Sequence, residues 1–201
     1  RGIKCVRGLE ISAYTEVKVH ILGYNVNSSC DEFTKFMSFV CDGAMERTMD
    51  ILAKLKKRGV NLSFGDVVRE RKCPQSPVHT MYIARAAARA IYKGYASSPS
   101  AFYADMLAPG RPVYSALGRP SPEYALEVIK KCGGISSLAH PGRLTLSPSE
   151  RLKLIEQLKA QGLDGIEAVY SGHTEVETAY FKEIAAKLSL LVTGGSDTHY
   201  A

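Results

Sequence analysis

The chain has 201 residues, of which 45% are hydrophobic, 23% charged and 8% aromatic. This length and composition support a sizeable core and exclude disordered and collagen-like proteins, and no apolar run approaches the roughly 20 residues that span a bilayer. Lys and Arg outnumber Asp and Glu by 26 to 20, which leaves a net charge of +6. This excess suits an anionic substrate such as a phosphate ester, although a solvated basic surface is the simpler explanation.

The first half of the chain is expected to begin with two strands and to continue as helices. Residues 5–13 and 17–24 are rich in β-branched and aromatic side chains, which is typical of strands. A long helix is expected over residues 31–57, because apolar side chains recur there at helical spacing: Met45, Met49, Leu52 and Leu55. Shorter helices are expected over residues 61–72, 81–92 and 99–107. Residues 109–122 hold four prolines and read as a connector.

The second half alternates between helix and strand. Helical patterns cover residues 123–132, 150–160 and 175–188, and strand patterns cover residues 135–139, 165–170 and 190–193. Such alternation indicates a parallel α/β sheet or barrel. The helical stretch before it is then an insertion, so we expect one domain from residues 1–32 and 110–201 and a second from residues 33–109.

The five cysteines are odd in number and far apart, at positions 5, 30, 41, 73 and 132, and they form no CxxC pair. This spacing disfavours a disulfide framework or a zinc knuckle and predicts buried free thiols in a reducing cytosol. The chain begins with Arg1 and shows no signal-peptide pattern. We therefore expect a cytoplasmic protein, of which this chain is a fragment or the ordered part.

Three histidines follow predicted strands of the second half: His140, His173 and His199, the last with Asp197 two residues before it. In parallel α/β folds the carboxyl ends of the strands form the rim on which active sites lie. Imidazole and carboxylate groups suit zinc, manganese and iron(II), and residues two apart on an extended segment point the same way. The pattern predicts a metal site at this rim.

Glu10 and His20 form a second candidate cluster on the two amino-terminal strands. Spacing alone leaves open whether they join the first cluster or are a surface carboxylate and a core histidine. A GxSxG elbow, a Walker A loop and a Rossmann fingerprint are all lacking, which disfavours serine hydrolases, P-loop NTPases and dinucleotide enzymes.

Seven short motifs occur in a fixed order along nearly the whole chain: Gly8-Leu-Glu-Ile-Ser-Ala13, Val19-His-Ile-Leu-Gly-Tyr24, Tyr82-Ile-Ala-Arg-Ala86, Lys93-Gly-Tyr95, Ser137-Leu-Ala-His-Pro-Gly-Arg143, Gly165-Ile-Glu167 and Gly195-Ser-Asp-Thr-His199. With this ordered set the chain resembles the PHP (polymerase and histidinol phosphatase) superfamily of metal-dependent phosphoesterases. The resemblance is nearest to the bacterial branch of 3′,5′-nucleoside bisphosphate phosphatases and 5′-to-3′ exoribonucleases.

The resemblance implies an α/β fold: a distorted (β/α)7, TIM-like PHP barrel, truncated at its amino terminus, with the helical insertion as a cap domain. It also implies up to three divalent metal ions, with manganese expected and zinc, iron and magnesium as alternatives. The metal ligands it implies are Glu10, His20, His140, Asp197 and His199. It makes His173 and Arg143 catalytic, substrate-binding residues, and Arg85 of the insertion a further substrate contact.

The function implied is hydrolysis of nucleotide phosphate esters by metal-activated hydroxide. The substrate would be a 3′,5′-nucleoside bisphosphate, a short RNA 5′ end, or both, and the protein a monomer without a membrane partner. The family's His-x-His strand and Thr-Asp-His-Asp loop have no counterpart before Glu10, and Thr80 and Tyr82 replace an arginine and a histidine common in relatives. Three alternatives stay open: a phosphatase of another phosphorylated metabolite, a non-catalytic PHP-like module, and nucleic-acid binding without hydrolysis.

Overall fold

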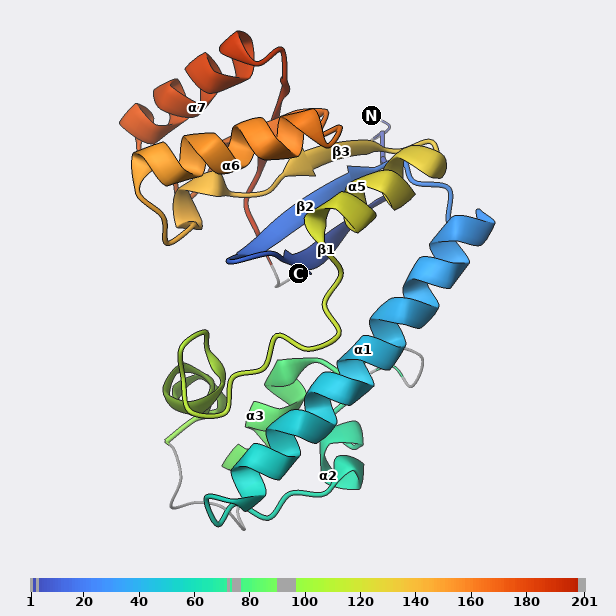
Figure 1. Cartoon of the computed structure of the whole chain (residues 1–201), viewed down its shortest axis with the longest axis vertical. Helices are drawn as coiled ribbons and strands as arrows, with labels where there is room; N and C mark the ends of the chain where they lie inside the picture. Colours follow the sequence, from blue (N-terminus) through green and yellow to red (C-terminus); the bar gives the residue numbers. More distant parts are fainter. Residues whose placement is uncertain (1, 3, 72, 74–76, 90–96, 199–201) are drawn as a thin grey trace. The chain divides into compact units, whose positions relative to one another are not determined.

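The computed structural model describes the chain except for residues 1, 3, 72, 74–76, 90–96 and 199–201 (Figure 1). The chain divides into two compact units. One comprises Arg1–Phe36 and Pro120–Ala201, and the other comprises Met37–Arg119. The second unit thus takes in residues 110–119, whereas the insertion expected from the sequence ends at residue 109.

A five-stranded mixed sheet, in the order β1-β2-β3-β4-β5, forms the centre of the first unit. Its strands are β1 (Gly8–Tyr14), β2 (Lys18–Tyr24), β3 (Ile135–Leu138), β4 (Gly165–Tyr170) and β5 (Leu191–Gly195). β2 is antiparallel to both β1 and β3, and β3, β4 and β5 are parallel. The parallel sheet expected for the second half is therefore present in β3–β5, and the described strands form an open sheet with edges β1 and β5. The closed seven-stranded barrel stays a prediction.

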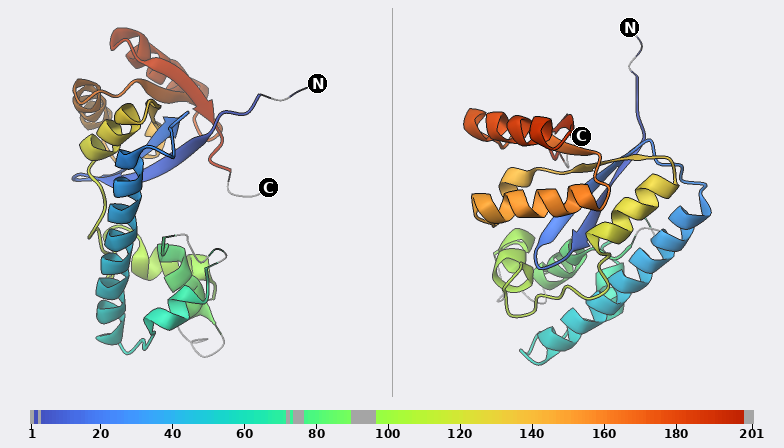
Figure 2. Two further views of the ribbon diagram at one scale, coloured as in Figure 1. Left: turned by 90° about the vertical axis from the view of Figure 1, so that its right-hand side faces the viewer. Right: turned by 45° about the horizontal axis from the view of Figure 1, so that its top comes forward.

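Three helices cover one face of this sheet: α5 (Pro122–Lys131), α6 (Pro148–Ala160) and α7 (Glu175–Lys187) (Figures 1 and 2). Their local sequences explain their starts. Ser147 with Glu150, and Thr174 with Glu177, form capping boxes at the beginnings of α6 and α7. The core between the helices and the sheet includes the fully buried Ile21, Leu138, Ile155 and Phe181.

The second unit is helical. It holds most of α1 (Asp31–Lys56), together with α2 (Phe64–Val68), α3 (Thr80–Ala88), α4 (Pro99–Phe102) and the π-helix η2 (Tyr103–Leu107). These elements share an apolar core around Leu55, Ile83 and Phe102, each of which is fully buried.

Of the four apolar residues on which the helix over residues 31–57 was predicted, Leu52 and Leu55 are buried and the two methionines are not. Met45 and Met49 are 49% and 53% exposed, whereas Ala44, Thr48 and Ile51 are buried. The buried stripe of α1 therefore runs through Ala44, Thr48, Ile51 and Leu55 and leaves Met45 and Met49 exposed. No helix within the described ranges has the length and hydropathy to cross a membrane.

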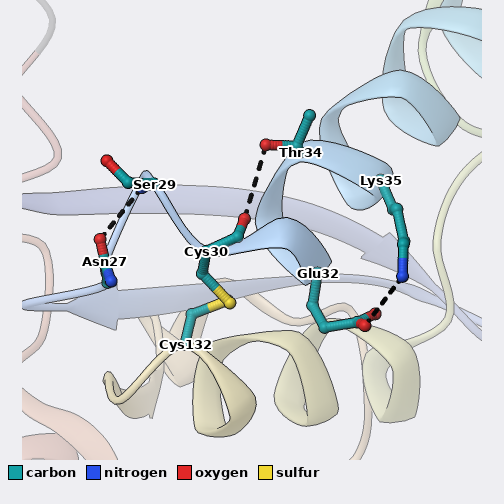
Figure 3. The surroundings of a disulfide bond; sticks show 7 residues. All are labelled: Asn27, Ser29, Cys30, Glu32, Thr34, Lys35 and Cys132. Atoms are coloured by element: carbon teal, nitrogen blue, oxygen red, sulfur yellow. Dashed lines mark hydrogen bonds and ion pairs between the residues drawn. A yellow bond between two sulfur atoms is a disulfide. The ribbon is translucent and has the colours of Figure 1, made fainter.

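A disulfide joins Cys30, just before α1, to Cys132, just after α5 (Figure 3). The two Cα atoms are 5.6 Å apart, although 102 positions separate the residues in the sequence. The expectation of buried free thiols is wrong for this pair, and Cys5 and Cys73 are exposed. Both cysteines lie in the first unit, and the pairing depends on how that unit packs, which no local spacing encodes.

Candidate metal centre and phosphate-binding turn

Strand pairing places Glu10 and His20 on the same face of the sheet. β1 and β2 pair so that Ser12 lies opposite His20 and Leu22 lies opposite Glu10. Residues directly opposite in a pair share a face, so Glu10 and His20 are diagonal neighbours within reach of each other. The other face carries Ile11 and Ile21, which are buried in the core. The alternation of the strands therefore presents Glu10 and His20 away from the covering helices.

His140 joins this pair from the end of β3. The backbone N–H of Ala139 donates to the carbonyl oxygen of His20 at 3.0 Å, which continues the pairing one residue beyond β3. His140 then takes a left-handed conformation, with φ at 29°, before the short 3₁₀ turn η3 (Pro141–Arg143). This reversal brings the buried His140 imidazole to the two residues on β1 and β2.

The three side chains converge on one point. Nδ1 of His20 lies 3.1 Å from Nε2 of His140, and Oε1 of Glu10 lies 3.5 Å from the same Nε2. Oε1 of Glu10 also makes a close contact with Nδ1 of His20. All three ligand atoms lie within 4.8 Å of one another. Among the described residues, this is the one group of at least three His, Cys, Asp or Glu side chains whose ligand atoms are close enough to hold a metal ion.

The electrostatics of the cluster favour ligands that are ready to bind a cation. Hydrogen bonds from His140 and then His20 hold the pKa of Glu10 well below its ordinary value, so its carboxylate stays ionised. Burial lowers the pKa of His20, against the opposing effect of Glu10, so this imidazole stays neutral with a lone pair. Neutral imidazole and ionised carboxylate are the forms that ligate metals.

The donor set and its spacing fit a divalent transition metal. Two imidazole nitrogens bound to one tetrahedral metal at about 2.0–2.1 Å lie roughly 3.3 Å apart, close to the 3.1 Å between His20 and His140. The ring nitrogens turned away from the cluster, Nε2 of His20 and Nδ1 of His140, are buried without a hydrogen-bond partner in the described structure. The two imidazoles are therefore held in place by the contacts of their other nitrogens with Glu10 and with each other.

Arg143 ends the turn that begins with His140. Its guanidinium forms an ion pair with Asp197, beyond β5, and donates to the Tyr170 hydroxyl at 3.4 Å. The Arg143 side chain is 57% exposed, whereas that of Asp197 is 14% exposed. The structure thus pairs Asp197 with Arg143 instead of placing it in the cluster of Glu10, His20 and His140, and its role as a metal ligand stays a prediction.

His173 lies beside the same turn, with both ring nitrogens facing backbone groups. Its Nε2 accepts a hydrogen bond from the N–H of Gly142 at 3.1 Å, and its Nδ1 lies 3.2 Å from the carbonyl oxygen of Ala168. A neutral ring protonated at Nδ1 satisfies both contacts. Contact with a phosphate would require one of these bonds to break, and the catalytic role expected for His173 stays a prediction.

Two predicted site residues, His199 and Arg85, are not part of the arrangement described above. His199 falls outside the described residues, as does the Lys93-Gly-Tyr95 motif. Arg85 lies exposed on α3, in the second unit, with its guanidinium 5.8 Å from the ring centroid of Tyr82.

Sequence reasoning missed the role of Glu167. This side chain is 4% exposed on β4, and its Oε2 accepts a hydrogen bond from the backbone N–H of His140 at 2.6 Å. The signal in the sequence was a carboxylate inside the otherwise apolar strand Gly-Ile-Glu-Ala-Val-Tyr, since buried carboxylates occur only where something binds them.

Comparison with known proteins shows relatives over nearly the whole chain, although no family model matches it. A 3′,5′-nucleoside bisphosphate phosphatase of Chromobacterium violaceum is 26% identical over 200 residues, which are 99% of this chain and 69% of the relative. A phosphoribosyl 1,2-cyclic phosphate 1,2-diphosphodiesterase of Eggerthella lenta is 29% identical over 206 residues, 98% of this chain and 74% of the relative. A 5′-3′ exoribonuclease of Haemophilus influenzae is 26% identical over 200 residues, 99% of this chain and 71% of the relative.

A solved structure of a similar protein shares this fold. A structure from Bifidobacterium adolescentis, described as a metal-dependent phosphoesterase, superposes with a TM-score of 0.80 at 27% identity, over 97% of this chain and 68% of that one. The relatives are all phosphoester hydrolases by name. The resemblance found in the sequence is thereby confirmed: this chain is similar to metal-dependent phosphoesterases of the PHP type.

Proposed function

We propose that this relative of phosphatases, phosphodiesterases and exoribonucleases is itself a metal-dependent phosphoesterase that hydrolyses phosphate esters of nucleotides. The substrate is a 3′,5′-nucleoside bisphosphate, the 5′ end of a short RNA, or both. The observation that carries the proposal is the convergence of Glu10, His20 and His140 on one point from β1, β2 and the turn after β3.

Glu10, His20 and His140 would hold a divalent metal ion, and Asp197 and His199 are proposed as further ligands for up to three ions. Manganese is the first candidate. Zinc and iron are alternatives, since sites that mix imidazole and carboxylate ligands accept all three metals. Such ions, when bound, supply a hydroxide nucleophile near neutral pH and offset negative charge on the phosphoryl group.

Arg143 is proposed to bind the phosphate. Its exposed guanidinium extends from the turn that carries His140, so a phosphoryl oxygen held by two of its N–H groups would lie beside the metal ligands. Binding would replace the ion pair between Arg143 and Asp197, and the Asp197 carboxylate would exchange this partner for a metal ion. His173 supports the turn, and its proposed part in orienting the phosphate or protonating the leaving oxygen requires its bond to Gly142 to open.

The proposal extends to the architecture. The open sheet β1–β5 is proposed to be part of a distorted seven-stranded TIM-like barrel, and the likeness to the longer Bifidobacterium structure supports this. The helical insertion is proposed to be a cap domain that carries Arg85 as a substrate contact. The absence of a membrane-spanning helix from the described ranges is compatible with the proposed cytoplasmic location of a monomer.

Release of inorganic phosphate from adenosine 3′,5′-bisphosphate in the presence of Mn²⁺ tests this function, with the protein at its natural length. We expect the parent to bind Mn²⁺ and release phosphate, and His140→Ala to lose both. Leu158→Ala, a core change in α6, serves as the folded control. A parent that binds no metal, or a His140→Ala variant that hydrolyses at the parental rate, would refute the proposal.

A second substrate class is favoured by the Eggerthella relative, which acts by its name on a cyclic phosphate of a phosphoribosyl group. Under this alternative the chain hydrolyses a small phosphorylated sugar. Parallel assays with a ribose cyclic phosphate and a 5′-phosphorylated RNA oligomer decide between the classes, because the metal requirement is the same and the preferred substrate differs.

A further inference from the structure

Glu167 is the one carboxylate side chain among the described residues that is buried. Burial of an ionised carboxylate is costly unless hydrogen bonds replace its water. Its Oε2 accepts from the backbone N–H of His140 at 2.6 Å, a charge-assisted bond of the strong kind. The location of Glu167 thus depends on a backbone group of a candidate metal ligand.

The space for Glu167 is created on the neighbouring strand. A Cβ atom at position 195 would lie 2.2 Å from Oε1 of Glu167, which is closer than real atoms approach. Only glycine at the end of β5 lets the Glu167 carboxylate keep its position between β5 and His140. The position of the Glu167 carboxylate therefore depends on the absence of a side chain at Gly195.

His140 needs such support, because its φ of 29° is uncommon for any residue with a Cβ. Conformations of this kind persist only where the surroundings hold them. Here the backbone is held at two points: the His140 N–H by Glu167, and the Gly142 N–H by His173. The direction of the His140 imidazole follows from this backbone, and its Nε2 faces Glu10 and His20.

We propose that Glu167 is a positioning residue of the metal centre: by binding the backbone N–H of His140 it locks the left-handed turn that aims Nε2 at Glu10 and His20. Gly195 serves the same end by leaving room for the carboxylate. This inference rests on the proposed function, since it assumes that the cluster binds a metal. Glu167 acts through His140 and contacts neither the metal nor the substrate.

Metal binding measured apart from catalysis tests this. Mn²⁺ affinity is followed by electron paramagnetic resonance, and Co²⁺ is added as a probe because its visible spectrum reports ligand geometry. Glu167→Leu removes the acceptor and should weaken Mn²⁺ binding by about 10- to 100-fold, as loss of outer supports of a metal ligand does. The Co²⁺ spectrum should change with it. Glu167→Gln keeps an amide oxygen as acceptor and should restore most of the affinity.

Two controls separate positioning from general damage. Leu158→Ala lowers stability in the same unit and should leave the Co²⁺ spectrum unchanged. Gly195→Ala should weaken metal binding in the manner of Glu167→Leu, whereas Gly194→Ala, whose Cβ would meet only Val169 at 3.2 Å or more, should weaken it far less.

The outcomes are distinct. A parent that binds neither Mn²⁺ nor Co²⁺ refutes the proposed function. A parent that binds both, with Glu167→Leu folded and unchanged in affinity and spectrum, refutes the positioning role and leaves the function intact. Equal losses in Glu167→Leu and Leu158→Ala would also refute positioning, because the effect would then follow stability.

Discussion

The imidazoles of His20 and His140 meet edge to face, with ring centroids 5.0 Å apart and Nδ1 of His20 3.1 Å from Nε2 of His140. The two residues lie 120 positions apart in the sequence. They meet because β2 pairs directly with β3 and the His140 turn folds back over the end of that pair. The candidate metal centre therefore depends on the pairing of two strands that the whole helical insertion separates in the sequence.

Acidification should destabilise the metal-free protein. Burial lowers the pKa of His20 from 6.5, so below about pH 6.5 the unfolded chain binds a proton that the folded chain does not, and stability falls. The lowered pKa of Glu10 contributes stability that is present above 4.5 and is lost as the pH falls through the folded value.

The measurement is the unfolding temperature, Tm, in a chelator from about pH 8 to about pH 5. His20→Gln should flatten the upper part of this decline, since its side chain does not titrate. A Tm that rises as the pH falls below 6.5 would contradict the assignment of a neutral, half-buried His20.

Arg143→Ala should impair catalysis without removing the metal. Loss of charge-assisted hydrogen bonds to a phosphate costs about 1.5–3 kcal/mol, so kcat/KM should fall roughly 10- to 100-fold. Mn²⁺ content should stay at the parental level, because Arg143 is no ligand. Lys153→Ala, which removes an exposed cation from α6, is the control and should retain full kcat/KM. Unchanged kinetics for Arg143→Ala would contradict its role.

Loss of the disulfide should lower stability. A cross-link between residues 102 positions apart restricts the unfolded chain strongly, and its removal typically costs about 2–4 kcal/mol. For a chain of this size Cys30→Ser should lower Tm by about 5–15 °C, whereas Cys41→Ser, outside the disulfide, should have a smaller effect.

Alkylation before and after reduction checks the bond itself: reduction should add two alkyl groups to the intact mass, on Cys30 and Cys132. Disulfides are uncommon in reducing cytosol, so the same experiment on protein from oxidised and reduced cells bears on the cytoplasmic location expected. Identical masses before and after reduction would show that the pair is not joined.

Gly43→Ala should destabilise the protein although alanine is the better helix former. In α1 this change would normally gain about 1 kcal/mol, but a Cβ on Gly43 would lie 2.0 Å from the carbonyl oxygen of Gly118. We expect a net loss of about 1–3 kcal/mol from this overpacking, measured by denaturant unfolding.

Gly65→Ala in α2 is the matched control, because the nearest atom to its new Cβ is Oγ of Ser63 at 3.6 Å. It should leave stability unchanged or raise it. If both alanine variants gained stability, the close approach of α1 to the segment that carries Gly118 would be incorrect.

The elements were predictable where their signals are local. The strand expected over residues 165–170 matches β4, and the long helix expected over residues 31–57 matches α1, which ends one residue earlier. The buried side of α1 was not predictable in this way. Its apolar residues lie on more than one side, and only the packing partners decide that Ile51 is buried and Met49 exposed.

The candidate site was predictable as a set of residue types and motifs, not as an arrangement. The ordered motifs identified Glu10, His20 and His140, but spacing left open whether the first two meet the third. The register of β1 with β2 and of β2 with β3 brings them together. The contacts of Glu167 and His173 with the turn after His140 likewise depend on that folded backbone, which no motif describes.

By itself the sequence determined the α/β character, the helix starts and the resemblance to phosphoesterases, because hydrophobic periodicity, capping and motifs act over a few neighbouring residues. Only the tertiary structure decided that Cys30 joins Cys132, that Arg143 pairs with Asp197, and that the carboxylate of Glu167 supports His140. Each of these contacts joins segments that are distant in the chain. Their formation depends on strand register and packing, which the whole fold sets together.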